Sequence, residues 1–123
     1  VSVIRAIADK ELVFLPRKHY PTARRFELAR VLGDWLTVPQ TGREWRVISD
    51  VSTVRQKRQR AFAAEFLCPI GLLTQFLGGD FSDTAIEEAS EHFRVSEWTV
   101  RSLLANNGYL PRFEPAVPYR LAA

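Results

Sequence analysis

The pattern of apolar and polar positions predicts both strands and helices along the chain. Residues 1–15 carry short apolar runs separated by polar residues, and residues 44–49 alternate, which is typical of strands. Over 21–36 and 52–67, apolar residues recur at three- and four-residue steps, which indicates two amphipathic helices with Phe26 and Phe62 on their buried faces. We therefore expect an α+β fold, in which a small antiparallel sheet packs on these two central helices.

The clearest local signals lie in the last part of the chain. Pro69 opens a short predicted helix that ends at the glycine pair 78–79. A capping-box layout over 84–87 predicts a helix that runs to about residue 93, and Ser96 caps a second helix that runs to 107. These signals predict a C-terminal helix-turn-helix-like pair.

Length and composition suit one small globular domain, since 46% of the 123 residues are hydrophobic and 25% are charged. We divide it into a core over 1–79, the helical pair over 80–110 and an extended tail over 111–123. The longest apolar stretch, 61–73, is shorter than the roughly 18–20 residues needed to cross a membrane. The lone Cys68 excludes an internal disulfide. We expect a cytoplasmic protein without membrane contact, and the absence of Met indicates further sequence before residue 1.

Metal-ligating residue types are few and scattered. His19, His92 and Cys68 lie in unrelated segments, whereas a zinc site needs several convergent donors. The chain also lacks a Gly-rich phosphate loop and a serine nucleophile turn. We therefore expect no metal and no cofactor.

Three segments resemble the ImmA/IrrE metallopeptidase family. Residues 58–69 are similar to its Ala-Asn-x-Phe-Ala-Ala-Glu-Leu-Leu-Met-Pro segment, and residues 25–34 to its Arg-Phe-x-Leu-Ala-His-Glu-Leu-Gly-His helix. Residues 89–103 resemble its Leu-Ala-x-x-Phe-x-Val-Ser-x-x-x-Val segment. The three follow the family's order and together cover about residues 20–110.

This chain departs from the family at every catalytic position. In the family, two histidines one helical turn apart bind zinc, and the glutamate between them acts as general base. Arg30 and Asp34 stand at the histidine positions, Val31 stands at the base, and Gln56 stands at the third ligand. Arginine cannot ligate zinc and valine cannot take a proton, so the resemblance implies a fold without a catalytic or metal centre. Arg30 and Asp34 either form an ion pair across one turn or are both solvated.

Cations mark two candidate contact surfaces. Arg55, Lys57, Arg58 and Arg60 form a basic segment, and Arg101 is the one residue placed to read base edges from the second helix of the C-terminal pair. The first helix of that pair is acidic, which opposes a phosphate backbone. We treat these five cations as candidate contacts for nucleic acid or a protein partner.

These observations favour a catalytically silent, metallopeptidase-like binding or sensing domain of a bacterial transcription regulator. The expected partner is a protein or an N-terminal regulatory module, while a homodimer and weak DNA binding stay open. Two alternatives compete with this interpretation. One is a DNA-binding module that uses the C-terminal helix pair, and the other is a metallopeptidase that recruits unusual ligands.

Overall fold

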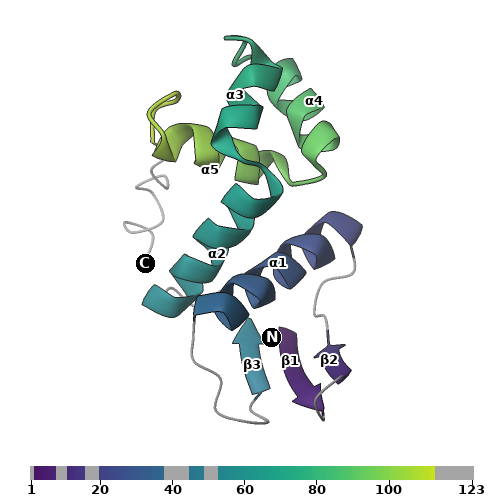
Figure 1. Ribbon diagram of the computed structural model, residues 1–123. Coiled ribbons are helices and arrows are strands. Elements are labelled where there is room, and N and C mark those ends of the chain that lie inside the picture. Colours follow the sequence, from purple (N-terminus) through teal and green to yellow (C-terminus); the bar gives the residue numbers. More distant parts are fainter. Residues whose placement is uncertain (1, 8–10, 16–19, 38–44, 49–52, 113–123) are drawn as a thin grey trace, which may run out of the picture.

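The computed structural model describes the backbone of residues 2–7, 11–15, 20–37, 45–48 and 53–112, and the side chains of 20–37 and 53–112. Five helices make up most of it: α1 (Pro21–Thr37), α2 (Val54–Leu67), α3 (Ile70–Leu77), α4 (Asp83–Phe93) and α5 (Glu97–Asn106). In Figure 1, α3, α4 and α5 gather at the upper end, and α1 lies alongside α2 below them.

The predicted α+β fold, with a small antiparallel sheet packed on the central helices, is wrong for the part of the chain whose side chains are described. That part is all-helical: its side chains lie on the five helices and on the segments between them, and none lies on a strand. Most of its buried apolar residues form one cluster between helices, and Ala29, Val31 and Ala63 are buried on α1 and α2, so helix-on-helix packing makes the described core. Alternating apolar and polar residues predict locally extended backbone, but they do not show which elements form the core.

Three short segments of paired strand backbone lie outside this helical unit. They are β1 (Ser2–Ile7), β2 (Glu11–Leu15) and β3 (Trp45–Ile48). The central strand, β1, runs antiparallel to both of its neighbours. Figure 1 draws them below α1.

The main apolar core lies among α3, α4 and α5. Serine caps start the last two helices, because the Ser82 hydroxyl accepts from the Ala85 amide and the Ser96 hydroxyl accepts from the Thr99 amide. The second cap confirms the predicted start at Ser96, whereas α4 begins at Asp83, one residue before the predicted capping box. The buried members of this core are Cys68, Leu73, Leu77, Ala85, Ile86, Ala89, Val95, Val100, Leu103 and Leu104. Because α3 contributes to it, this core spans the predicted boundary between residues 79 and 80.

Left-handed residues end two of these helices. Gly78 closes α3 with a φ of 58°, which confirms the stop predicted from the glycine pair. Arg94 closes α4 with a φ of 55°, a conformation that disfavours a residue with a side chain. The turn between α4 and α5 is therefore held in place by its surroundings.

The interface between α1 and α2 is built differently. Gly33 allows close approach, because a Cβ atom there would lie 2.5 Å from Cδ1 of Phe62. The two predicted core residues, Phe26 and Phe62, are only partly buried. Five polar or charged side chains are buried on these two helices, namely Glu27, Arg30, Asp34, Gln56 and Gln59. A polar network, and not an apolar core, thus occupies much of this interface.

Candidate functional site

The residues at the family's zinc-ligand positions come together in the α1–α2 interface. Arg30 and Asp34 lie one turn apart on α1 and are only 3% and 1% exposed. Gln56 faces them from α2 and is also buried. Of the two alternatives left open for this pair, the one in which both side chains are solvated is therefore wrong.

A buried guanidinium occupies the place where the resemblance puts a metal ion. Arg30 Nη2 donates to Gln56 Oε1 at 2.7 Å and to Gln59 Oε1 at 3.3 Å. Burying a permanent charge is costly unless hydrogen-bond acceptors replace water, and the two amide oxygens supply that replacement. The prediction missed Gln59, although its three-residue spacing from Gln56 puts both amides on one face of α2.

Asp34 is held by a second arginine. Arg55 approaches it with both ends of the guanidinium: Nε lies 2.7 Å from Asp34 Oδ1, and Nη2 lies 2.7 Å from Oδ2. This two-point contact fixes the geometry of the carboxylate as well as offsetting its charge. Arg55, predicted as part of a surface for a partner, thus stabilises the α1–α2 interface.

The general-base position is apolar and buried. Val31 is 4% exposed and presents hydrocarbon where the family carries a glutamate. A hydrocarbon side chain cannot accept a proton from water. In the structure, Arg30, Val31, Asp34 and Gln56 therefore act in packing and charge neutralisation.

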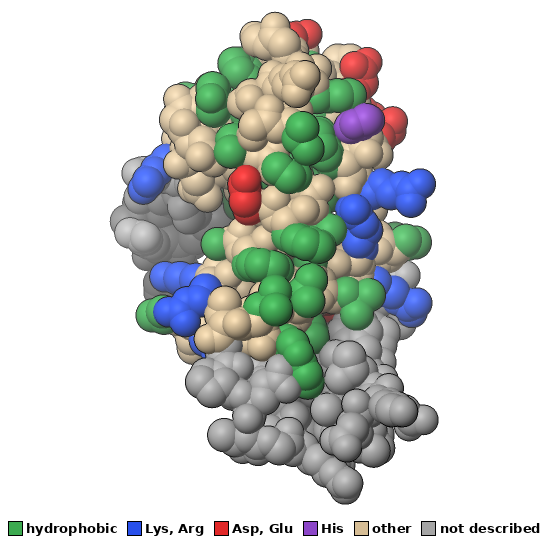
Figure 2. Space-filling model, in the orientation of Figure 1, with side chains coloured by type: hydrophobic (Ala, Val, Ile, Leu, Met, Phe, Trp, Pro, Cys, Tyr) green, Lys and Arg blue, Asp and Glu red, His purple; other side chains and the backbone are tan. Residues whose placement is uncertain are grey.

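The residues of the basic segment of α2 have different surroundings. Gln56 and Gln59 face α1, whereas Lys57 and Arg58 are exposed and Arg60 is half-buried. Lys57 and Arg60 line a pocket, but Arg58 does not. Figure 2 shows blue side chains flanking the middle of the molecule and red ones over the upper end. The four predicted cations therefore differ in exposure and in what they contact.

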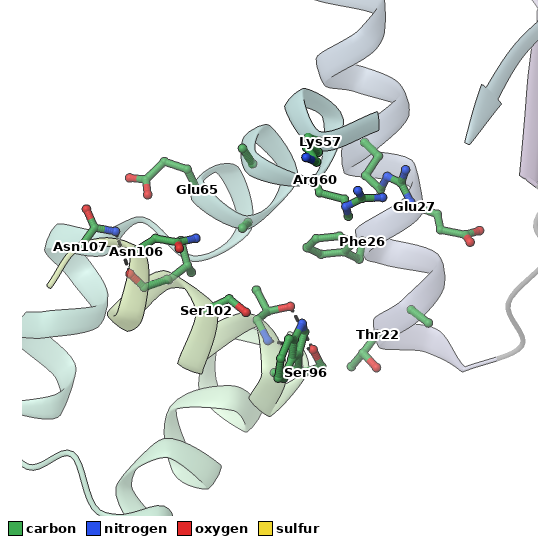
Figure 3. A pocket seen from close by; sticks show the side chains of 17 residues that line it. Thr22, Phe26, Glu27, Lys57, Arg60, Glu65, Ser96, Ser102, Asn106 and Asn107 are labelled. Carbon is green, nitrogen blue, oxygen red and sulfur yellow. Dashed lines mark hydrogen bonds between the residues drawn. The ribbon is translucent and has the colours of Figure 1, made fainter. Parts of the chain in front are cut away.

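A pocket of about 620 Å³ lies between α1, α2 and α5 (Figure 3). The space exists because small residues face it: Ala23 on α1, Ala61 and Ala64 on α2, and Ser102 on α5. Figure 3 shows Phe26 pointing from α1 into the space. The other lining residues are Thr22, Glu27, Arg30, Lys57, Arg60, Glu65, Ser96, Trp98, Thr99, Leu103, Asn106 and Asn107. The prediction missed this pocket, because its walls come from three separate parts of the chain.

The predicted base-reading residue of the C-terminal pair has a partner within the chain. Arg101 Nη2 donates to Asp83 Oδ1 at 2.7 Å, which joins α5 to the start of α4. Trp98, one turn earlier on α5, is 59% exposed and lines the interhelical pocket. On α5, Arg101 is thus paired with a residue of α4, and Trp98 presents an exposed aromatic ring.

One arginine joins α1 to the end of α4. Arg25 Nη1 donates to the carbonyl of Phe93 at 2.7 Å and to that of Arg94 at 3.0 Å. The last carbonyls of a helix carry partial negative charge and lack partners within the helix, so a guanidinium is a favourable cap. This contact holds the α3–α5 core against α1 on one side of the pocket.

His92 and Cys68, two of the candidate metal ligands, have different structural surroundings. The His92 ring stacks on Phe76 with ring centres 4.4 Å apart. Cys68 is buried in the apolar core, and this burial raises the pKa of its thiol to about 11. His19 lies outside the described residues. Within 20–37 and 53–112, no three His, Cys, Asp or Glu side chains are grouped closely enough to hold a metal ion.

Comparison with known proteins finds no family model, no curated protein and no solved structure that matches this chain. Among the described helices, none alone has the length and apolar character to cross a bilayer. Only α2 and α3 taken together reach that length and composition, and they are bent by 48°.

Proposed function

We propose that this chain is a catalytically silent binding or sensing domain of a bacterial cytoplasmic regulator, and that its ligand binds in the interhelical pocket. The main observation behind the proposal is a contrast between two neighbouring regions, the α1–α2 interface and the pocket. The degenerate motif positions are filled and closed by hydrogen bonds, whereas the space beside them is open and lined by charged, polar and aromatic groups.

The closed network argues against catalysis at the motif positions. Arg30 has no lone pair to give to a metal ion, and both of its neighbouring amide oxygens accept from its guanidinium. Asp34 Oδ1 and Oδ2 each accept from Arg55. A metal ion at this position would have to displace two guanidinium groups from buried partners, which the remaining donors could not offset.

The open pocket has the properties of a small-molecule site. Its volume of about 620 Å³ lies inside the range of roughly 300–1,000 Å³ that such sites occupy. It lies between the α1–α2 pair and α5, and junctions of this kind are frequent ligand sites. A ligand there would contact both parts of the molecule, which suits a sensing role.

A ligand screen by amide NMR tests this function. We expect compounds from a small-fragment library to shift resonances of α1, α2 and α5, and those shifts to disappear in Ala61→Trp, where an indole fills the pocket. Gln75→Trp, on the exposed face of α3, is the matched control and should keep the shifts. Identical shifts in Ala61→Trp and the parent, or an absence of pocket shifts, would contradict the proposal.

Elemental analysis tests the catalytically silent part separately. The purified chain should carry no stoichiometric zinc after incubation with the metal, and it should not cleave an unfolded protein substrate. One zinc per chain that is lost in Asp34→Asn would instead support the metallopeptidase with unusual ligands.

The DNA-binding alternative gains no specific support. Arg101 is bonded to Asp83, and α4 exposes Glu87, Glu88 and Glu91 beside it. A phosphate backbone approaching α4 would meet these carboxylates.

A further inference from the structure

The walls of the interhelical pocket indicate which chemistry its ligand has. Two cations, Lys57 and Arg60, line it from α2, where their three-residue spacing puts them on neighbouring positions of one helix face. In Figure 3, the carboxylate of Glu27 points away from α5, and Glu65 lies at the far end of α2. The Glu65 carboxylate also accepts from the Ile70 amide at the start of α3. The α2 wall therefore favours a negative charge.

The opposite wall supplies an aromatic surface. On α5, residues Trp98, Ser102 and Asn106 follow one another at four-residue steps and all line the pocket. A second hollow of about 560 Å³ lies against these same three residues. Trp98 thus has open space beside it, and its exposed indole can pack against a planar ring.

We propose that the pocket binds a small planar aromatic anion, whose ring packs on Trp98 and whose negative charge contacts Lys57 and Arg60. This inference rests on the proposed function and names the ligand class of the same site. Ala61 and Ala64 also line the pocket, and their short side chains leave space for a ring between α2 and α5. The hydroxyl of Ser102 and the amide of Asn106 remain for polar substituents on the ring edge.

A matched set of four compounds distinguishes the contribution of the negative charge to affinity from that of the aromatic ring. Naphthalene-2-carboxylate and 2-naphthyl phosphate carry both features, naphthalene-2-carboxamide keeps the ring without the charge, and cyclohexanecarboxylate keeps the charge without the aromatic ring. We expect NMR titration to show binding of the two aromatic anions, with the tighter one identifying the anionic group. The amide and the cyclohexane compound should each bind at least about tenfold more weakly, as the loss of a charge-assisted or stacking contact requires.

Variants of the pocket assign the two contacts to residues. Lys57→Gln combined with Arg60→Gln should weaken the aromatic anions about tenfold but leave the amide unchanged. Trp98→Ala should weaken all three aromatic compounds, and its indole is exposed enough for the fold to survive the change. Arg58→Gln removes a cation from the same helix outside the pocket and should change nothing.

Several results would overturn the proposal. These are equal affinity for the carboxylate and its amide, an equal loss in Arg58→Gln, or no binding by any aromatic anion. If a fragment screen still finds other ligands that Ala61→Trp excludes, the pocket is a binding site and only the ligand class is wrong. If that screen finds none, the proposed function fails as well.

Discussion

Two interfaces of this molecule are buried to a similar degree but have opposite chemistry. Among α3, α4 and α5, the core is apolar, and Leu73, Ile86 and Leu104 are each 0% exposed. Between α1 and α2, Arg30 and Asp34 are 3% and 1% exposed yet charged. Apolar contacts are non-directional, whereas a buried donor must meet its acceptor at a narrow range of distances. We infer that the first interface supplies most of the stability and that the second fixes the relative position of its helices.

The largest expected effect comes from the apolar core. Ile86→Ala should lower the free energy of unfolding by about 2–5 kcal/mol, because it removes buried methylene groups and leaves a cavity. Urea denaturation measures the change. Leu72→Ala, at a position that is 55% exposed, should cost less than about 1 kcal/mol. Equal losses at the two positions would mean that the core has been misplaced.

An intermediate effect is expected from the polar interface. Asp34→Ala removes the acceptor of both Arg55 donors and should cost about 1–3 kcal/mol. The Arg55 side chain is 47% exposed, so water can solvate it, and the loss stays below that of a fully buried pair. Arg58→Ala, on the exposed face of α2, is the control and should stay within about 0.5 kcal/mol. If Asp34→Ala behaves like Arg58→Ala, the polar interface contributes little.

Close packing of α1 on α2 can be tested at Gly33. Gly33→Ala would bring a methyl group to 2.5 Å from Cδ1, 2.6 Å from Cγ and 2.9 Å from Cβ of Phe62. It should cost about 1–3 kcal/mol, because rotating the ring does not move Cβ away and the two helices must shift. Combining it with Phe62→Ala, which removes Cγ and the ring, should cost less than the sum of the two single losses, as thermal denaturation of the three variants would show. Additive losses in the double variant would indicate that the two residues do not contact each other.

The smallest effect is expected at the surface pair of the C-terminal helices. Arg101→Ala should change stability by no more than about 1 kcal/mol, because its partner Asp83 is 94% exposed and solvent screens the pair. Titration of labelled duplexes should also show only weak, non-specific DNA binding by the parent chain, with or without this change. Sequence-selective, nanomolar binding that Arg101→Ala abolishes would restore the DNA-binding alternative.

Sequence predicts the helices well because their signals are local. The predicted helix over 21–36 is observed as Pro21–Thr37, and the one over 52–67 as Val54–Leu67. The Ser96 cap and the glycine stop at 78–79 depend only on residues within one turn. The predicted fold class was wrong, because alternating apolar and polar residues identify extended segments but do not show which elements pack together in the core.

The site was less predictable because its contacts join distant segments. Arg30 reaches Gln56 and Gln59 across 26 and 29 positions, and Arg55 reaches Asp34 across 21. The resemblance predicted that Gln56 lies beside α1, and its three-residue spacing from Gln59 puts both amides on one face of α2. No local pattern distinguishes Arg55 from the exposed residues of that helix. The interhelical pocket is harder still to predict, since it depends on the space left between three helices.

The Arg25 contact has a consequence for the order in which the molecule assembles. Its guanidinium and the Phe93 carbonyl are 68 positions apart, so the contact closes a loop that contains α2 and α3 as well as most of α1 and α4. During synthesis α1 leaves the ribosome long before α4 exists, and distant contacts form late because the chain must first be brought together. We therefore expect the hydrogen bonds of Arg25 to form last during folding. We also expect them to break first when the chain is pulled from its ends.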